Sequence, residues 1–253
     1  MPAADGFQPG TRKSKIRLNQ IGIIAALLPE AACLTREPIA PRTLIRLGTN
    51  ISLYVSGMGA ERAADAARAM VQAGMDVLVS WGTAGAVAAH LHAGDLCVPE
   101  AILGFDDQVY QTAKHWRSSV VNKLVDCPCD IYLGQMADAV RVLTTADEKT
   151  GITERNKSVI AVDMESAAIA AVAGDTEKPF IVIRVISDAA GTVIPDIAIK
   201  ISDPFGRVRL TRLLSQTLTR PLQIPGLIKL ALDYGKAART MRWIGERLPE
   251  VFS

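Results

Sequence analysis

Apolar residues along the first 190 positions form short continuous runs, separated by stretches in which they recur at helical spacing. Continuous aliphatic and β-branched runs are typical of strands that are buried on both faces of a sheet. The pattern predicts strands over residues 18–28, 50–55, 75–81, 140–145, 159–162 and 179–188. It also predicts a helix over 60–73, a polar helix or loop over 147–156, and a helix of small residues after Glu165. An α/β fold is therefore expected.

Acidic residues stand where two of these strands end. Asp163 and Glu165 lie at the change from strand to helix, and Asp188 closes the strand that begins near Pro179. Carboxylates in the first turn of a helix are also favoured by the helix dipole, so the pair at 163 and 165 has a purely structural alternative. Two strands that each end on a carboxylate, with one helix between them, favour a shared cleft.

Two glycine-containing segments follow other predicted strands. Ser56-Gly57-Met58-Gly59 comes after the strand at 50–55, and Gly82-Thr83-Ala84-Gly85 comes after the strand at 75–81. Glycine lets backbone N–H groups approach an anion or a sugar closely, although such a segment is more often only a turn.

The two strand-end motifs together resemble a known family. Val162-Asp163-Met164-Glu165-Ser166-Ala167, followed by Arg184-Val185-Ile186-Ser187-Asp188, is similar to the signature of the nucleoside phosphorylase superfamily. This superfamily includes purine nucleoside phosphorylases and methylthioadenosine/S-adenosylhomocysteine nucleosidases. The resemblance implies a single-domain three-layer α/β sandwich, in which helices flank a central mixed β-sheet. It also implies an enzyme that cleaves an N-ribosidic bond.

The resemblance gives the candidate site residues their roles. An ionised Glu165 would accept hydrogen bonds from the ribose hydroxyls and face the cationic sugar, with Met164 packed against the ribose. Asp188 would be the general acid at purine N7, oriented by Ser187. The remaining substrate contacts are expected from Ser56, Gly57, Thr83, Ala84 and Gly85.

Glu30 is the candidate that decides the nucleophile. It matches the last of a run of acids that follows the first strand in the superfamily's nucleosidases, although Leu28 and Pro29 depart from that run. Water activated by Glu30 would make the enzyme a hydrolase. Phosphate bound by the glycine-containing segments would make it a phosphorylase, but Ser80 stands where bacterial purine phosphorylases carry an arginine. Both remain open, and no cofactor is expected beyond phosphate as a co-substrate.

Composition narrows the class of protein. The chain has 253 residues, of which 49% are hydrophobic and 21% charged, which suits one domain with one core. No apolar run reaches the roughly 20 residues of a membrane-spanning helix, and residues 1–15 resemble a loose tail rather than a secretory signal. A cytoplasmic protein is expected. The four cysteines are predicted to be free thiols, and Cys127-Pro128-Cys129 lacks the spacing of a metal or redox pair.

The C-terminal fifth is basic and amphipathic. Residues 200–253 hold ten Lys and Arg against four Asp and Glu, a net charge of +6, which leaves −4 for the rest of the chain. We predict a catalytic domain over 16–200 and a helical extension over 201–253. The extension either packs on the core or on a second subunit of a homodimer, or lies on an anionic membrane surface.

The segment Thr219 to Ala231 is similar to the hopanoid-associated members of the superfamily. That resemblance implies release of adenine from adenosylhopane, a lipid nucleoside, by an enzyme peripheral to the inner face of the membrane. A methylthioadenosine/S-adenosylhomocysteine nucleosidase with a longer tail is the alternative enzyme. A non-catalytic nucleoside- or nucleic-acid-binding module is the third reading, and the lack of aromatic residues among the basic ones disfavours nucleic acid. His115 and Trp116 could line the pocket for the group attached to the ribose, or belong to the core.

Overall fold

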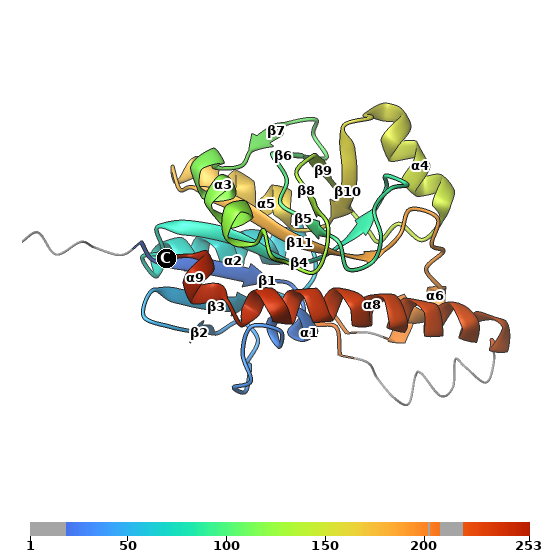
Figure 1. Cartoon of the computed structure of the whole chain (residues 1–253), viewed down its shortest axis with the longest axis horizontal. Coiled ribbons are helices and arrows are strands. Elements are labelled where there is room, and N and C mark those ends of the chain that lie inside the picture. Colours follow the sequence, from blue (N-terminus) through green and yellow to red (C-terminus); the bar gives the residue numbers. More distant parts are fainter. Residues whose placement is uncertain (1–18, 202, 208–219) are drawn as a thin grey trace, which may run out of the picture.

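The computed structural model describes residues 19–201, 203–207 and 220–253 (Figure 1). Its strands are β1 Ile21–Ala25, β2 Leu44–Arg46, β3 Ile51–Val55, β4 Val77–Ala86, β5 Leu96–Cys97, β6 Ala101–Leu103, β7 Val109–Gln111, β8 Ile131–Tyr132, β9 Gln135–Asp138, β10 Val159–Asp163 and β11 Phe180–Asp188. Its helices are α1 Leu28–Ala31, α2 Ala60–Gln72, α3 Lys114–Lys123, α4 Ala146–Arg155, α5 Ser166–Asp175, α6 Asp196–Ile201, η1 Pro221–Gln223, α8 Ile224–Gly245 and α9 Leu248–Val251.

The strands form one mixed sheet. Its main path runs β2-β3-β1-β4-β10-β9-β6-β7, and β11 pairs with β4 and β5. β1 pairs in parallel with β3 and β4, and β11 pairs in parallel with β4, whereas β10 runs antiparallel to β4. The central strand β4 therefore pairs with β1, β11 and β10.

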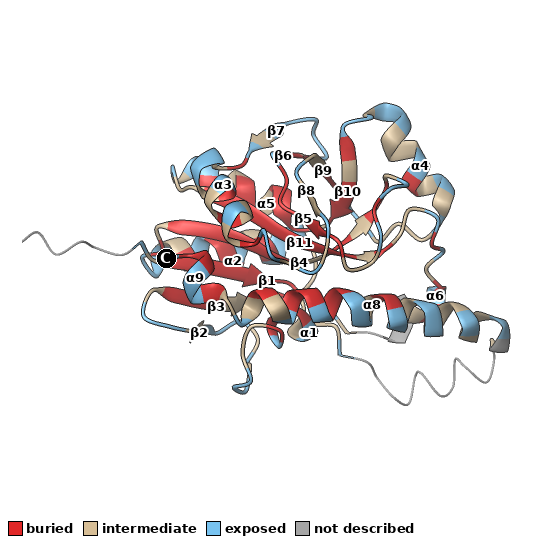
Figure 2. Ribbon diagram, viewed as in Figure 1, coloured by how far each residue is buried: buried red, intermediate tan, exposed pale blue. Residues whose placement is uncertain are grey.

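Alternate side chains of the central strands enter two different cores. Ile21 and Ile23 of β1 pack with α1, α3, α8 and α9 on one face. Ile24 and Leu78 point to the other face, which α2 and α5 cover with small side chains. The predicted three-layer α/β sandwich with a central mixed sheet is thus confirmed, and the buried sheet between the helices is visible in Figure 2.

The long helix α8 packs on the sheet through its C-terminal half. Ala237, Ala238, Met241 and Ile244 are buried in the same core as β1 and β11, whereas the half that begins at Ile224 is largely exposed (Figure 2). None of the helices in the described part of the chain combines the length and the apolar composition that crossing a bilayer requires.

Two predicted elements differ from the structure. The strand expected over 140–145 does not form. Val140 is 67% exposed, and the strand that joins the sheet here is β9, which begins five residues earlier. The segment Gly82 to Gly85 is not a loop but the second half of β4, which pairs with β10 and β11. The predicted tail over 1–15 lies outside the described residues.

Candidate active site

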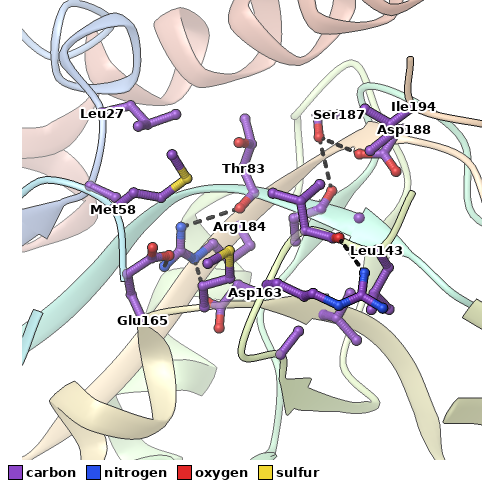
Figure 3. Close-up of a pocket in the computed structure, with 18 of the residues that line it drawn as sticks. Leu27, Met58, Thr83, Leu143, Asp163, Glu165, Arg184, Ser187, Asp188 and Ile194 are labelled. Atoms are coloured by element: carbon purple, nitrogen blue, oxygen red, sulfur yellow. Dashed lines mark hydrogen bonds and ion pairs between the residues drawn. The ribbon is translucent and has the colours of Figure 1, made fainter. Parts of the chain in front are cut away.

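A pocket of about 170 Å³ opens where the ends of β1, β10 and β11 meet the second half of β4. Eight of the ten predicted site residues line it, namely Glu30, Thr83, Ala84, Gly85, Met164, Glu165, Ser187 and Asp188. Figure 3 shows Glu165 and Arg184 on one side of the pocket and Asp188 on the other.

Strand pairing explains why the predicted acids meet. Val162 of β10 and Asp188 of β11 both pair with Gly85 of β4. Because β10 and β11 flank the same residue, the carboxylates at their ends face one cleft. Gly85 also leaves the room that Asp188 occupies, since a Cβ at position 85 would lie 3.2 Å from Asp188 Oδ2.

Glu30 is held by three donors at the floor of the pocket. Its Oε1 accepts from the Thr83 backbone N–H and hydroxyl, both at 2.8 Å, and its Oε2 accepts from the Leu27 N–H at 3.0 Å. The residue is 1% exposed. Gly82 has a φ of 153°, and any side chain there would collide with Glu30 and Arg184. The glycine therefore lets the carboxylate and the guanidinium approach each other.

Arg184 organises the other two acids. Its Nε lies 2.8 Å from Asp163 Oδ2, and its Nη2 lies 3.5 Å from Glu165 Oε2 and donates to Ser80 Oγ at 2.9 Å. Asp163 also accepts from the Ser166 hydroxyl, which closes the start of α5. One buried cation thus serves two buried carboxylates.

Glu165 is the titratable group that this environment perturbs. Its Oε1 accepts from the Gly59 N–H at 2.9 Å, at the start of α2. Burial raises the pKa of Glu165 to about 7, with Asp163 adding to the rise and Arg184 opposing it. The group therefore changes charge near neutral pH.

Asp188 is paired on both oxygens. Ser187 Oγ donates to its Oδ1 at 2.8 Å, and Lys149 Nζ donates to its Oδ2 at 2.5 Å. Both members of the ion pair are buried. Ser187 thus lies where the sequence predicted an orienting hydroxyl.

Two predicted substrate contacts lie outside the pocket lining, which corrects their expected position. Ser56 is buried, and its hydroxyl lies within hydrogen-bonding distance of the carbonyl oxygens of Gly57 and Ala25. Gly57 is backed by Phe205. The segment reaches the pocket through Met58 and through the Gly59 N–H instead.

His115 and Trp116 do not line the pocket either. His115 is exposed on α3, and Trp116 packs against Phe252 of the C-terminal end, with ring centroids 6.5 Å apart. Among the described residues, no three His, Cys, Asp or Glu side chains are grouped as a metal site.

Sequence reasoning did not assign Arg184 or Lys149 to the site. Arg184 carried a signal, because a charged residue inside a buried apolar strand needs a buried partner. Lys149 carried none, since it lies in a polar helix among exposed residues.

Comparison with known proteins decides the family. A profile of the family described as the Phosphorylase superfamily matches residues 20–201. The chain belongs to the phosphorylase superfamily. The predicted family and the predicted class of enzyme, one that cleaves N-glycosyl bonds, are thereby confirmed. The match ends before α8.

Similar individual proteins are consistent with this family assignment. A 5′-methylthioadenosine/S-adenosylhomocysteine nucleosidase from Haemophilus ducreyi is 27% identical over 206 residues, which cover 68% of this chain and 85% of the relative. The S-adenosylhomocysteine nucleosidase of Streptococcus pyogenes, solved with 5-methylthiotubericidin, is 26% identical with a TM-score of 0.61 and covers 70% and 86% of the two chains. A futalosine hydrolase from Helicobacter pylori shares the fold, with 21% identity, a TM-score of 0.60, and 69% and 86% coverage.

Proposed function

We propose that this chain is a nucleosidase that releases adenine from an adenine nucleoside by hydrolysis of the N-ribosidic bond. The observation that carries the proposal is the placement of Glu30 and Glu165 beside Arg184 in the same pocket as Asp188. The named nucleosidases among its relatives support the choice of substrate class.

The pocket suits the charge that develops in the reaction. As the C1′–N9 bond breaks, the ribose gains oxocarbenium character and the purine keeps the electron pair. Carboxylates near the sugar stabilise the positive charge. Glu165 would also accept hydrogen bonds from the 2′ and 3′ hydroxyls, with Met164 against the sugar, and Asp188 would protonate N7.

The charge balance favours water over phosphate as the nucleophile. Arg184 is paired with Asp163 and Glu165, Lys149 with Asp188, and Arg141, the third cation of the pocket lining, with Glu148. The buried Glu30 has no cation of its own among these pairs. A phosphate ion would meet a surplus of negative charge there. Ser80 does not replace the missing phosphate ligand, because it is fully buried and bonded to Arg184 and Ser166.

An assay of adenine release tests the proposal. The purified protein should release adenine from methylthioadenosine or from another adenine nucleoside at the same rate with and without phosphate. The sugar product should be the free sugar with its 5′ substituent intact, which is 5-methylthioribose when methylthioadenosine is the substrate. Asp188→Asn should lower turnover by about 10²–10⁴-fold, the usual effect of losing a positioned acid. Strict dependence on phosphate, with the 1-phosphate of the same sugar as product, would make the chain a phosphorylase.

A lipid on the ribose 5′ carbon, as in adenosylhopane, is the finer proposal. Ile194 lines both the catalytic pocket and a neighbouring surface hollow that also contains Val193 and Leu222. Val193, Leu222, Ile228 and Leu232 are all exposed, Leu222 by 94%. We name Val193, Ile194 and Leu222, which line this hollow together, the apolar rim, whereas Ile228 and Leu232 are exposed on α8 outside it. An apolar 5′ substituent leaving the pocket past Ile194 would be covered by this rim.

The rim also supports a peripheral membrane contact through the extension over 201–253. Lys229 and Arg220 lie near it on the same part of the chain, so that apolar and basic groups alternate there. This composition suits an anionic lipid surface. Release of adenine from the small substrates of the named relatives is the alternative. The predicted homodimer stays a prediction.

A further inference from the structure

Lys149 is a buried lysine whose three N–H donors all have acceptors. Its Nζ donates to Asp188 Oδ2 at 2.5 Å, to the Ala189 carbonyl at 2.9 Å and to the Thr192 carbonyl at 3.4 Å. The residue is 1% exposed. An ammonium group has three donors, so none is left to contact a substrate. Whatever Lys149 does in catalysis, it does through Asp188.

The surroundings hold Lys149 in this position from three sides. Helix α4 begins at Thr145, whose side chain caps the N–H of Glu148 directly before Lys149. The loop after β11 wraps the ammonium, and its Ile194 N–H donates to the Thr144 carbonyl at 2.9 Å. Lys229 of α8 donates to the hydroxyl of Thr192 at 3.1 Å. A buried ammonium group is unfavourable unless it is paired, so Lys149 depends on Asp188 and on the two carbonyl acceptors for its place in the core.

The ion pair poses a chemical problem for the proposed general acid. With the proton on Lys149, Asp188 is an anion and has no proton of its own to give to purine N7. The only transferable proton of the pair lies on the Lys149 nitrogen, 2.5 Å from Asp188 Oδ2. A catalytic acid needs a proton donor within such a hydrogen bond.

We propose that Lys149 is the positioning residue that supplies, through Asp188, the proton that leaves with adenine. This inference rests on the proposed nucleosidase function. When the C1′–N9 bond breaks, its electron pair stays on the purine and N7 takes a proton from Asp188. Asp188 in turn takes the proton of the Lys149 Nζ–H, and the neutral amine is reprotonated from solvent after product release. One N–H bond forms on the purine and one breaks on Lys149.

The test compares two leaving groups. Adenine must be protonated as it leaves, whereas 4-nitrophenolate leaves as a stable anion. Lys149→Met keeps the length of the side chain and removes the proton. It should lower kcat for adenine release by about 10²–10⁴-fold. On 4-nitrophenyl β-ribofuranoside the same variant should stay within about 3-fold of the unaltered protein, and KM should change little on either substrate.

A charge-conserving variant gives a second readout. Lys149→Arg keeps the charge but holds its protons too firmly to pass one on, so it should restore the fold and not the adenine rate. Lys157→Met, at an exposed lysine just after α4, is the matched control and should leave both rates unchanged.

Each outcome decides one question. Equal losses on both substrates, or full rescue by Lys149→Arg, would make Lys149 structural and overturn the inference. If Lys149→Met does not fold, Lys149→Gln, whose amide still donates a hydrogen bond to Asp188 but has no proton to transfer, is measured in its place. It should lose adenine release and keep cleavage of the nitrophenyl riboside, and equal losses on both substrates would overturn the inference. An unaltered protein that cleaves the nitrophenyl riboside but no adenine nucleoside would instead refute the proposed function.

Discussion

Glu165 is buried, and its pKa lies close to neutral pH. Burial among Asp163 and Glu30 raises its pKa to about 7, and Arg184 limits the rise. In the proposed reaction the ionised form is the active one, because a neutral acid neither accepts two hydroxyl hydrogen bonds well nor stabilises an oxocarbenium ion. The charge of this one side chain therefore sets the acid limb of the pH profile.

This gives a prediction for activity. The kcat/KM for adenine release should rise about tenfold per pH unit below pH 7 and level off above it. Glu165→Gln should abolish this limb and cost at least 10²-fold on a riboside, with a smaller loss on the matching 2′-deoxyriboside, which lacks the hydroxyl that the carboxylate holds. Initial rates between pH 5 and 9 measure both effects. Equal losses on the two sugars would show that Glu165 is structural.

The same pKa predicts a stability effect of known sign. A carboxyl whose pKa rises from 4.5 to about 7 on folding binds its proton more tightly in the folded state. This contribution to the free energy of unfolding is therefore complete below pH 4.5 and lost as pH rises through about 7. Glu165→Gln should remove that part of the decline, which urea unfolding at pH 5 and pH 8 measures.

The residues found from the sequence are those at strand ends. Glu165 and Asp188 follow apolar runs, and their meeting at Gly85 follows from which strands pair. Lys149 could not be found in this way, because a lysine in a polar helix looks the same whether it faces water or a carboxylate. Ser56 follows an apolar run as well, yet it lies outside the pocket lining, with its hydroxyl near the carbonyl oxygens of Gly57 and Ala25.

At the scale of elements, α8 is the helix whose sequence pattern and surroundings disagree. Apolar residues recur at helical spacing from Leu227 to Ile244, yet Leu227 and Leu230 are only half-buried and Ala231 is exposed. The sheet is shorter than this 22-residue helix, so only the half from Ala237 onward finds a core to enter. Spacing predicts which face is apolar, but not how far the neighbouring layer extends.

Two glycines of α8 test how closely that second half packs. At Gly245 an added methyl group would collide with the carbonyl oxygen of Cys33, whereas at Gly235 nothing lies within 4 Å. Gly235→Ala should raise the free energy of unfolding by about 0.5–1 kcal/mol, the usual gain in helix propensity. Gly245→Ala should lower it by about 1–3 kcal/mol, because a backbone oxygen cannot move aside easily. Thermal unfolding of the two variants provides the comparison, and two gains would show that α8 does not lie against α1.

At the scale of the whole molecule, the pocket and the exposed half of α8 are joined by one loop. Thr192 holds both Lys149 and Lys229, and Ile194 lines the pocket while belonging to the apolar rim. An extension that lies outside the family match thus touches the loop behind the candidate acid. The surface of α8 is therefore connected to Asp188 through the contacts of Lys229, Thr192 and Lys149.

Binding to lipid vesicles tests the proposed role of this surface. Residues 200–253 carry a net charge of +6, and each basic group near an anionic leaflet contributes about 1 kcal/mol. Burying exposed side chains of the rim would add about 1.5–3 kcal/mol for each one fully covered. The protein should therefore sediment with anionic vesicles at low salt. High salt should release it, because the electrostatic attraction is screened.

Two pairs of charge-introducing variants distinguish vesicle binding by the rim from non-specific binding by any exposed apolar side chain. Replacing Val193 and Leu222 with Glu should abolish sedimentation, while the same change at Val109 and Val125, which are also exposed but lie at β7 and after α3, should weaken it only slightly. The first pair should also slow adenine release from a lipid nucleoside in vesicles and leave a water-soluble nucleoside unaffected. This comparison of the two nucleosides tests the substrate itself, because it shows whether the rim affects catalysis and not only binding to vesicles. If both pairs bind vesicles equally, or if the intact protein ignores vesicles at every salt concentration, the rim is covered by something other than lipid, and a small soluble adenine nucleoside is the substrate class that remains.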